Sequence, residues 1–221
     1  MFFISGPLYL NPVVLPKSFH ISWIASCGFN IGWLFAWSYE KIFVSFVMLL
    51  LYLVCGYVAS AVQAIATADH VDRLKREARK ELIAIYVLVQ NGTDILFAWS
   101  TVATLVNLSM ALTYDPIFSN SISSRTASLI SLSILLVLVI SWSVFENTIF
   151  FKFFSFIYTW YAVLIWAPIG ILVKNYDISN PNTILTIVIL VVAVICLAIK
   201  ITVYVLKTKG SKSSEKDPLT G

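Results

Sequence analysis

The sequence predicts an all-α membrane protein, a polytopic bundle of six transmembrane helices. Two observations carry this prediction. Apolar residues make up 59% of the 221 residues and charged residues only 12%, which is too little charge to cover the surface of a soluble domain of this size. The apolar residues also gather in runs of about 20, the length that a helix needs to cross a bilayer core of about 30 Å.

Six such runs follow one another along the chain. The third run is longer than a span requires and carries polar residues in its first half. No proline or turn pair divides it, so we expect one long helix. The fifth run contains Pro168, which removes a backbone donor and is expected to kink the helix. The expected spans are 19–37, 42–63, 84–113, 125–145, 153–173 and 183–206.

The flanking segments complete the expected domain organisation. Prolines interrupt the apolar residues of 1–18, which we interpret as a lead-in or as the remnant of an upstream helix. Residues 19–206 are expected to form the six-helix transmembrane domain. The polar residues 207–221 are expected to form a disordered cytoplasmic tail.

The loop charges predict the orientation. Six spans place the N-terminus, the 64–83 and 146–152 loops and the C-terminal tail on one side. Basic residues concentrate on the cytoplasmic side of membrane proteins, so both termini are expected in the cytoplasm, while the identity of the membrane stays open. The first side holds eleven basic residues, namely Lys17, Arg73, Lys75, Arg76, Arg79, Lys80, Lys152, Lys207, Lys209, Lys212 and Lys216, and the other holds Lys41, Arg125 and Lys174.

Asp94 is the one acidic residue that lies deep in an apolar run. Buried carboxyl groups in membranes usually face the bundle interior or a cavity. Two interpretations stay open: a group that binds a proton or a ligand in a polar pocket, or a carboxyl near the cytoplasmic interface that bonds to Asn91 or to water. Residues at helical spacing on the same face are Gln90, Thr101, Thr104 and Asn107.

The other charges near the runs receive simpler interpretations. Lys200 lies near the end of the sixth run, where its ammonium is expected to reach the interface. Glu146 and Lys152 flank a short loop and are expected to be interfacial. The charged segment 69–82 is expected to be helical and to face the solvent, or to bind anionic lipid or a partner.

Small residues suggest close helix packing. Gly28 and Gly32 in the first run, and Gly56 and Ser60 in the second, are spaced four apart, which lets two helix backbones approach. These faces are expected to pack within the bundle or to join copies in a homo-oligomer. The three cysteines, each in an apolar run, are expected to be buried, namely Cys27, Cys55 and Cys196.

Several function classes are not expected. The sequence has no catalytic Ser/His/Asp set, no metal-ligand spacing and no phosphate-binding glycine loop, so we expect neither an enzyme nor a metal nor another cofactor. It also lacks an interleaved basic and aromatic face, so no nucleic-acid partner is expected. The expected partners are the lipid bilayer and a small hydrophobic molecule.

Short tryptophan and asparagine motifs resemble a known family. The Asn-x-x-Trp segment FNIGWLFAW (29–37) is followed by LYLVCGYVA (51–59), WSTVATLVN (99–107) and WAPIGILVKN (166–175). In order and spacing these segments are similar to those of the tryptophan-rich sensory proteins, the TspO/MBR family. The resemblance covers about 29–175 and implies a chain without the family's N-terminal helix, of which residues 7–16 are a remnant.

The resemblance implies that a porphyrin-like or sterol-like molecule binds in an aromatic-lined helical cavity, in a sensory or transport-related role. Two alternatives stay open: an auxiliary subunit that packs in a larger membrane complex, and a proton-coupled transporter that uses Asp94. The candidate ligand-binding residues are Asn30, Trp33, Trp37, Asp94, Trp99, Asn107 and Trp166.

Overall fold

The computed structural model describes residues 13–118 and 122–214, and the side chains of these residues up to Lys209. Helices are the only regular secondary structure in this part of the chain. The upstream remnant expected at 7–16 falls mostly outside it. The described chain turns helical at Lys17, close to the expected start of the first span.

All six apolar runs are helical. The first, second, fourth and sixth form single helices, and the sixth continues past the expected end at 206. The fifth begins later than expected, because a short separate helix and a loop precede it. The bounds are α2 Lys17–Ser38, α3 Ile42–Asp69, α6 Asn91–Tyr114, α7 Ser124–Asn147, α8 Phe151–Phe154, α9 Thr159–Asn175 and α10 Pro181–Ser214.

Four of the predicted spans are confirmed by length and composition: α3, the helix Arg79–Tyr114, α7 and α10 are long and apolar enough to cross a membrane. The other two runs fall short of that standard. Helix α9 has 17 residues, which corresponds to about 25 Å. Helix α2 is long enough, but His20, Asn30 and several tryptophans dilute its apolar residues.

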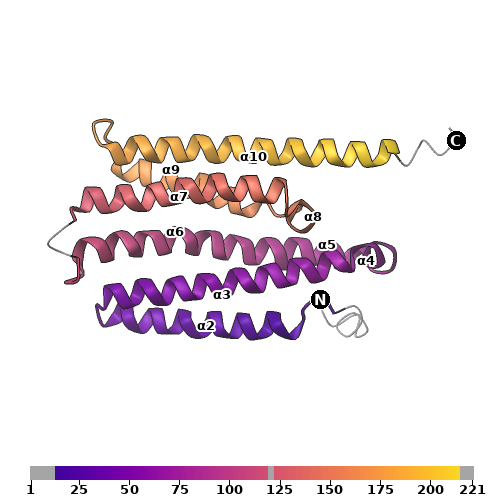
Figure 1. The fold of residues 1–221 in the computed structure, drawn as a ribbon, viewed down its shortest axis with the longest axis horizontal. Helices are drawn as coiled ribbons and strands as arrows, with labels where there is room; N and C mark the ends of the chain where they lie inside the picture. Colours follow the sequence, from indigo (N-terminus) through magenta and orange to yellow (C-terminus); the bar gives the residue numbers. More distant parts are fainter. Residues whose placement is uncertain (1–12, 119–121, 215–221) are drawn as a thin grey trace.

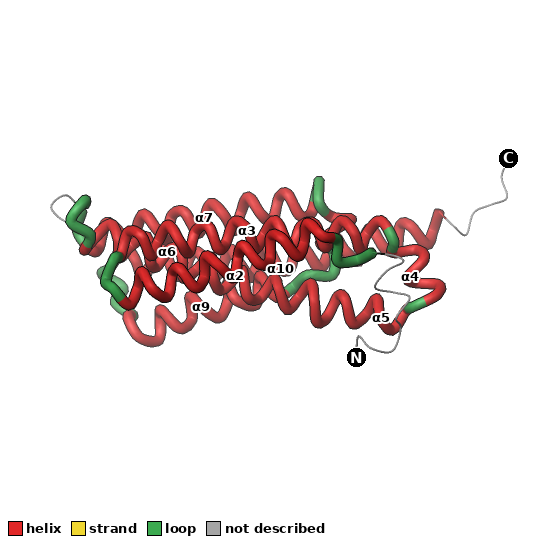
Figure 2. Tube along the Cα trace, turned by 90° about the horizontal axis from the view of Figure 1, so that it is seen from below, coloured by secondary structure: helices red, strands yellow, loops and turns green. Residues whose placement is uncertain are grey.

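The long helices lie side by side and nearly parallel to one axis (Figure 1). Helix α2 packs on α3, α3 on α6, and α6 on both α7 and α9, while α10 covers α7 and α9. The view in Figure 2 shows the same elongated bundle, with several loops at its ends and others set inward from the end that holds α4 and α5. One end holds the connections at 39–41 and 176–180, and the other holds α4 (Val71–Glu77) and α8.

The third run is one continuous helix, as expected, but its first part contains a π-helical segment. Helix α5 (Arg79–Ala84) leads into η1 (Ile85–Gln90), a π-helical segment, which leads into α6. The Asn91 backbone N–H donates to the Tyr86 carbonyl oxygen and so closes the wider turn, and the Asn91 side chain donates to the same oxygen at 2.8 Å. Such π-helical turns are frequent at functional sites. The chain reverses before α5 at Ala78, so the charged 69–82 segment is helical in two pieces.

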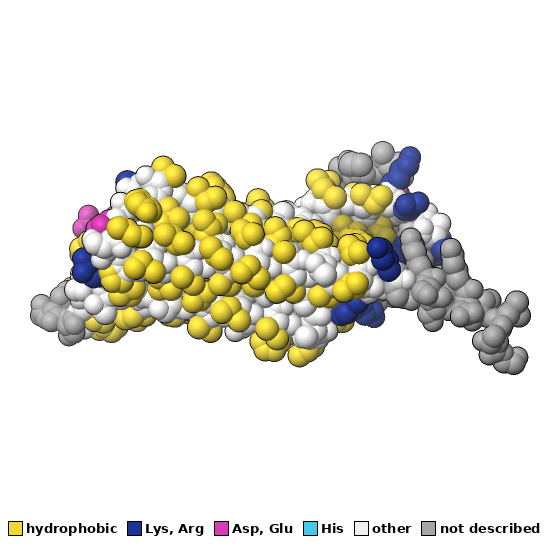
Figure 3. Space-filling view, turned by 90° about the horizontal axis from the view of Figure 1, so that it is seen from above, with side chains coloured by type: hydrophobic (Ala, Val, Ile, Leu, Met, Phe, Trp, Pro, Cys, Tyr) yellow, Lys and Arg dark blue, Asp and Glu magenta, His cyan; other side chains and the backbone are white. Residues whose placement is uncertain are grey.

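Apolar side chains cover most of the long outer surface, and basic side chains gather near its ends (Figure 3). Val173, Tyr39 and Ile24 are among the most exposed large apolar side chains. Water would not favour such a surface, whereas a bilayer solvates it. Cys27 is exposed on this surface too, which contradicts its predicted burial, while Cys196 is buried as expected.

Phe97 of α6 holds the α2, α3 and α6 side of the bundle together. Its ring contacts Trp23, Tyr52 and Tyr57 at centroid distances of 5.6–5.9 Å. Gly56 of α3 faces this ring so closely that a Cβ atom would lie 2.0 Å from Phe97 Cε1. The Gly56 face is therefore used inside the chain, by α6, and is not free for a second copy.

The first-run glycines do not share one interface. A Cβ atom on Gly32 would meet the Met48 sulfur at 3.2 Å, whereas Gly28 has no heavy atom within 4 Å. Gly32 thus supports the packing of α2 on α3. Gly28 faces away from the described chain, and oligomer formation through it stays a prediction.

We expect Gly56→Ala to lower the stability by about 1–3 kcal/mol, because the added methyl group overpacks a site where Phe97 is wedged among three rings. The measurement is the thermal unfolding midpoint of the purified chain in detergent. Gly28→Ala is the matched control and should unfold at or above the wild-type temperature, since alanine favours helices. Equal midpoints for both variants would contradict the close approach.

Candidate functional site

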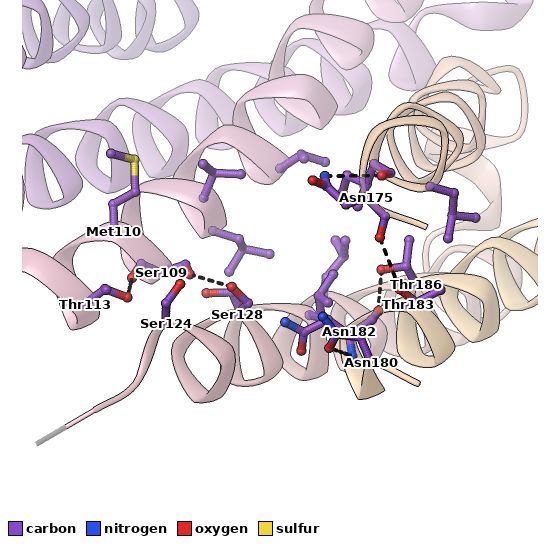
Figure 4. Close-up of a pocket in the computed structure, with 18 of the residues that line it drawn as sticks. Ser109, Met110, Thr113, Ser124, Ser128, Asn175, Asn180, Asn182, Thr183 and Thr186 are labelled. Atoms are coloured by element: carbon purple, nitrogen blue, oxygen red, sulfur yellow. Dashed lines mark hydrogen bonds between the residues drawn. The ribbon is translucent and has the colours of Figure 1, made fainter. Parts of the chain in front are cut away.

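A cavity of about 540 Å³ lies between α6, α7, α9 and α10. It is close to the bundle end that holds the 176–180 connection, and Figure 4 shows side chains from all four helices converging on it. Its size falls within the range of small-molecule sites, about 300–1,000 Å³. The labelled lining residues are Ser109, Met110, Thr113, Ser124, Ser128, Asn175, Asn180, Asn182, Thr183 and Thr186.

Helical spacing explains how α6 builds one wall. Val102, Val106, Ser109 and Thr113 recur at intervals of three or four residues and therefore share one helix face. The apolar members lie towards the middle of the helix and the hydroxyls towards its end. Ser109 reaches across to Ser128 of α7, with 3.2 Å between the hydroxyl oxygens. The cavity thus has an apolar inner part and a polar outer part.

The connection between α9 and α10 shapes the polar end. Asp177 Oδ1 accepts from the Ser179 hydroxyl at 2.7 Å and from the Ser179 backbone N–H at 3.0 Å. These hydrogen bonds hold the pKa of Asp177 below its ordinary value. Asn180 Oδ1 accepts from the Asn182 backbone N–H at 3.1 Å, which caps the start of α10. The turn therefore fixes Asn180 and Asn182 at the cavity.

The electrostatics of the cavity are those of an uncharged site. Every residue that lines it is apolar, or carries a hydroxyl or an amide. Two of its buried polar atoms, Ser131 Oγ and Asn182 Oδ1, have no hydrogen-bond partner in the described structure. Buried polar atoms are normally paired, so these two atoms are exceptions in the packing around the cavity, and a bound molecule would reach them only after a side-chain movement.

Trp99 and Trp166 are brought together by the fold. Their rings stack, with centroids 5.2 Å apart, and both side chains are about half exposed on the outer surface. Trp99 lies one turn from Val102 on the α6 face that lines the cavity. Neither ring lines the cavity, and Trp99 is one helical turn from its nearest lining residue on α6.

Asn107 and the three candidates on α2 do not line the cavity. Asn30, Trp33 and Trp37 belong to α2, which packs on α3. Trp33 and Trp37 have ring centroids 6.5 Å apart, and Trp33 Nε1 is buried without a partner. Asn107 is buried and accepts from the Ser45 hydroxyl at 3.0 Å, so it joins α6 to α3. The structure thus stacks Trp99 on Trp166 and places Asn30, Trp33 and Trp37 on α2, and a ligand site at any of the seven residues stays a prediction.

Asp94 is buried, together with the polar residues predicted on its helix face. The Thr159 hydroxyl lies 2.9 Å from Asp94 Oδ2 and 2.9 Å from the Asn91 carbonyl oxygen. Asn91 Oδ1 accepts from the Tyr158 backbone N–H at 3.0 Å. Helix α6 therefore holds the first residues of α9, whose own side chains do not cap it.

Glu146 and Lys200 form a buried ion pair, which contradicts two predictions. Glu146 and Lys200 are not interfacial but buried, and Lys200 Nζ lies 2.6 Å from Glu146 Oε2. Lys200 also donates to the Ile157 carbonyl oxygen, and the Tyr161 hydroxyl donates to Glu146 Oε1. A buried ammonium must be paired inside the protein, and the Glu146 carboxylate and the Ile157 carbonyl oxygen pair that of Lys200. A sequence signal existed, because Glu146 directly follows the fourth apolar run and Lys200 lies within the last residues of the sixth.

A family model described as TSPO-like protein matches residues 13–203. The chain belongs to the TSPO-like family. The match covers nearly all of the described residues and confirms the resemblance seen in the tryptophan motifs. Together with the apolar helices it establishes an integral membrane protein. No curated protein and no solved structure matches this TSPO-like chain.

We expect Lys200→Met to destabilise the TSPO-like bundle by about 3–5 kcal/mol, because it leaves the Glu146 charge buried without its cation. The double variant Glu146→Gln/Lys200→Met should recover most of this loss. The measurement is unfolding of the purified chain in detergent, with Lys174→Met, at an exposed position of α9, as the control. A Lys200→Met variant as stable as the control would exclude a buried pair.

Proposed function

We propose that this TSPO-like protein binds or moves a small hydrophobic molecule in the cavity between α6, α7, α9 and α10. The observation that carries the proposal is the cavity itself, with its apolar inner wall and the unpartnered Ser131 Oγ and Asn182 Oδ1. An apolar pocket with a few convergent polar atoms is the usual design of a small-molecule site. The role is binding or transport, not catalysis.

The lining favours a ligand with a neutral polar group on an apolar body. Ser131 and Asn182 lie on different helices, α7 and α10, so both sides of the cavity contribute polar groups. The lining contains no Lys or Arg to pair with a carboxylate. Of the two ligand types implied by the family resemblance, this supports a sterol-like molecule over a porphyrin with ionised carboxylates.

We expect a sterol-like ligand to change the tryptophan fluorescence of the purified protein in a saturable way, and Trp99→Phe to remove most of that change. Trp99 lies beside the cavity, whereas Trp37 lies on α2. A change that survives in Trp99→Phe and is lost in Trp37→Phe would place the ligand at α2, as the Asn30, Trp33 and Trp37 prediction requires.

Filling the cavity gives an independent test of the same proposal. Ser131→Leu should weaken ligand binding at least tenfold, because it fills space and removes a polar partner. Ser143→Leu, at another buried serine of α7 that does not line the cavity, is the matched control for a change of helix packing. Equal affinities in both variants would count against the cavity.

We also propose that all six helical runs span the bilayer and that both termini are cytoplasmic. The arrangement of the ends supports this: the start of α2, α4, α8 and the end of α10 share one end of the bundle (Figure 1). That end carries Arg73, Lys75 and Lys152, together with Lys207, as expected for a cytoplasmic face.

Single cysteines introduced into a variant without native cysteines test this topology. The protein is expressed in cells in which the non-cytoplasmic face of its membrane is exposed to the medium. Cysteines at Lys75 and Lys152 should then react with a membrane-impermeant thiol reagent only after the membrane is permeabilised. Cysteines at Glu40 and Ser179 should react in intact cells. Equal labelling of Glu40 and Lys75 in intact cells would exclude six spans.

A further inference from the structure

Three charged side chains are buried in the described part of the bundle: Asp94, Glu146 and Lys200. Two carboxyl groups therefore share one ammonium group. If all three were ionised, the interior would carry one net negative charge. An uncompensated charge in a low-dielectric interior is costly, and such groups usually become neutral.

The hydrogen bonds show that the Lys200 ammonium pairs with Glu146 and not with Asp94. Lys200 Nζ lies 2.6 Å from Glu146 Oε2, and the Tyr161 hydroxyl donates to the other oxygen of Glu146. Both oxygens of Glu146 thus accept strong donors, which stabilises an ionised carboxylate. Asp94 accepts a hydrogen bond from the Trp160 backbone N–H, but among the described residues no basic side chain lies within ion-pair distance of it.

The Thr159 hydroxyl bonds in a way that suits a neutral Asp94. A hydroxyl group has one proton to donate, yet Thr159 Oγ1 lies 2.9 Å from both Asp94 Oδ2 and the Asn91 carbonyl oxygen. A carbonyl oxygen cannot donate. Both contacts are hydrogen bonds when Asp94 carries a proton and donates it to Thr159, which then donates to Asn91.

Two further polar groups near Asp94 lack partners. Gln90 precedes Asp94 by one helical turn on the same face, is 2% exposed, and has neither amide atom bonded. The Ser60 hydroxyl of α3 is also buried and unpaired. The bonds Ser45–Asn107 and Tyr52–Ser100 set the antiparallel register of α3 and α6, which places Ser60 level with Gly92, between Gln90 and Asp94.

We propose that Asp94 is a proton-binding site in the interior of the bundle, occupied at neutral pH and surrounded by Thr159, Gln90 and Ser60. The ligand is a proton, and the site is separate from the cavity and independent of its ligand. The titratable groups on the packed helices are Tyr57 of α3, Glu146 of α7, Tyr161 of α9 and Lys200 of α10. Of the two carboxyl groups, Glu146 stays ionised with Lys200, so Asp94 holds the proton.

Infrared spectroscopy of the purified full-length protein in lipid nanodiscs tests this proposal. A protonated carboxyl group has a carbonyl stretching band that ionised carboxylates lack. At pH 7 the wild type should show this band and Asp94→Asn should not. Asp177→Asn, which changes an exposed loop carboxyl group, should keep it. Thr159→Val should keep the band at a shifted frequency, because the acid loses its acceptor.

The outcomes that overturn the proposal are equally definite. A wild type without the band at pH 7 has an ionised Asp94. A band that persists in Asp94→Asn belongs to another carboxyl group. A band that disappears when sodium ions are added at constant pH indicates a cation site. If Asp94→Asn does not fold, the Thr159→Val shift assigns the band, and an unshifted band contradicts the proposal.

Discussion

The start of α9 is held from two sides, and the interior of the bundle is organised around it. From α6, Asn91 bonds to the Phe156 carbonyl oxygen and the Tyr158 N–H, and Asp94 bonds to Thr159. From α10, Lys200 reaches the Ile157 carbonyl oxygen and the Glu146 carboxylate of α7. A helix that begins within an apolar environment must satisfy its backbone groups inside the protein, and these contacts do so.

This constraint explains features that otherwise look unrelated. Asn91 ends the π-helical segment before α6 with its backbone N–H, and its side chain bonds both to that segment and to the start of α9. The stacking of Tyr86 on Phe156, with ring centroids 4.5 Å apart, adds an apolar contact at the same point. Because these hydrogen bonds fix where α9 starts, the length of α9 fixes the position of its other end and of the turn to α10. Those elements form the polar end of the cavity.

The two polar regions divide the interior of the protein by chemistry. The cavity is uncharged and has unpaired hydroxyl and amide atoms, which suit a neutral molecule. The region around Asp94 and Glu146 contains all the buried charges of the described chain. Tyr57 of α3 reaches α6 and α9, where its hydroxyl bonds to Thr101 and to the Trp160 indole. The proposed site for a hydrophobic molecule and the proposed proton site therefore lie in separate parts of one bundle.

The sequence by itself determined the membrane class, the six helical runs, the family and the inward face of α6 with Asp94 and Asn107. Hydropathy and helical spacing are local properties, so they can be read along the chain. Only the tertiary structure decided that Glu146 pairs with Lys200, 54 residues away, that Trp99 stacks on Trp166, that Gly56 faces Phe97 and that four helices line one cavity. These features depend on which helix faces meet and in what register, and side-chain packing between distant segments sets both.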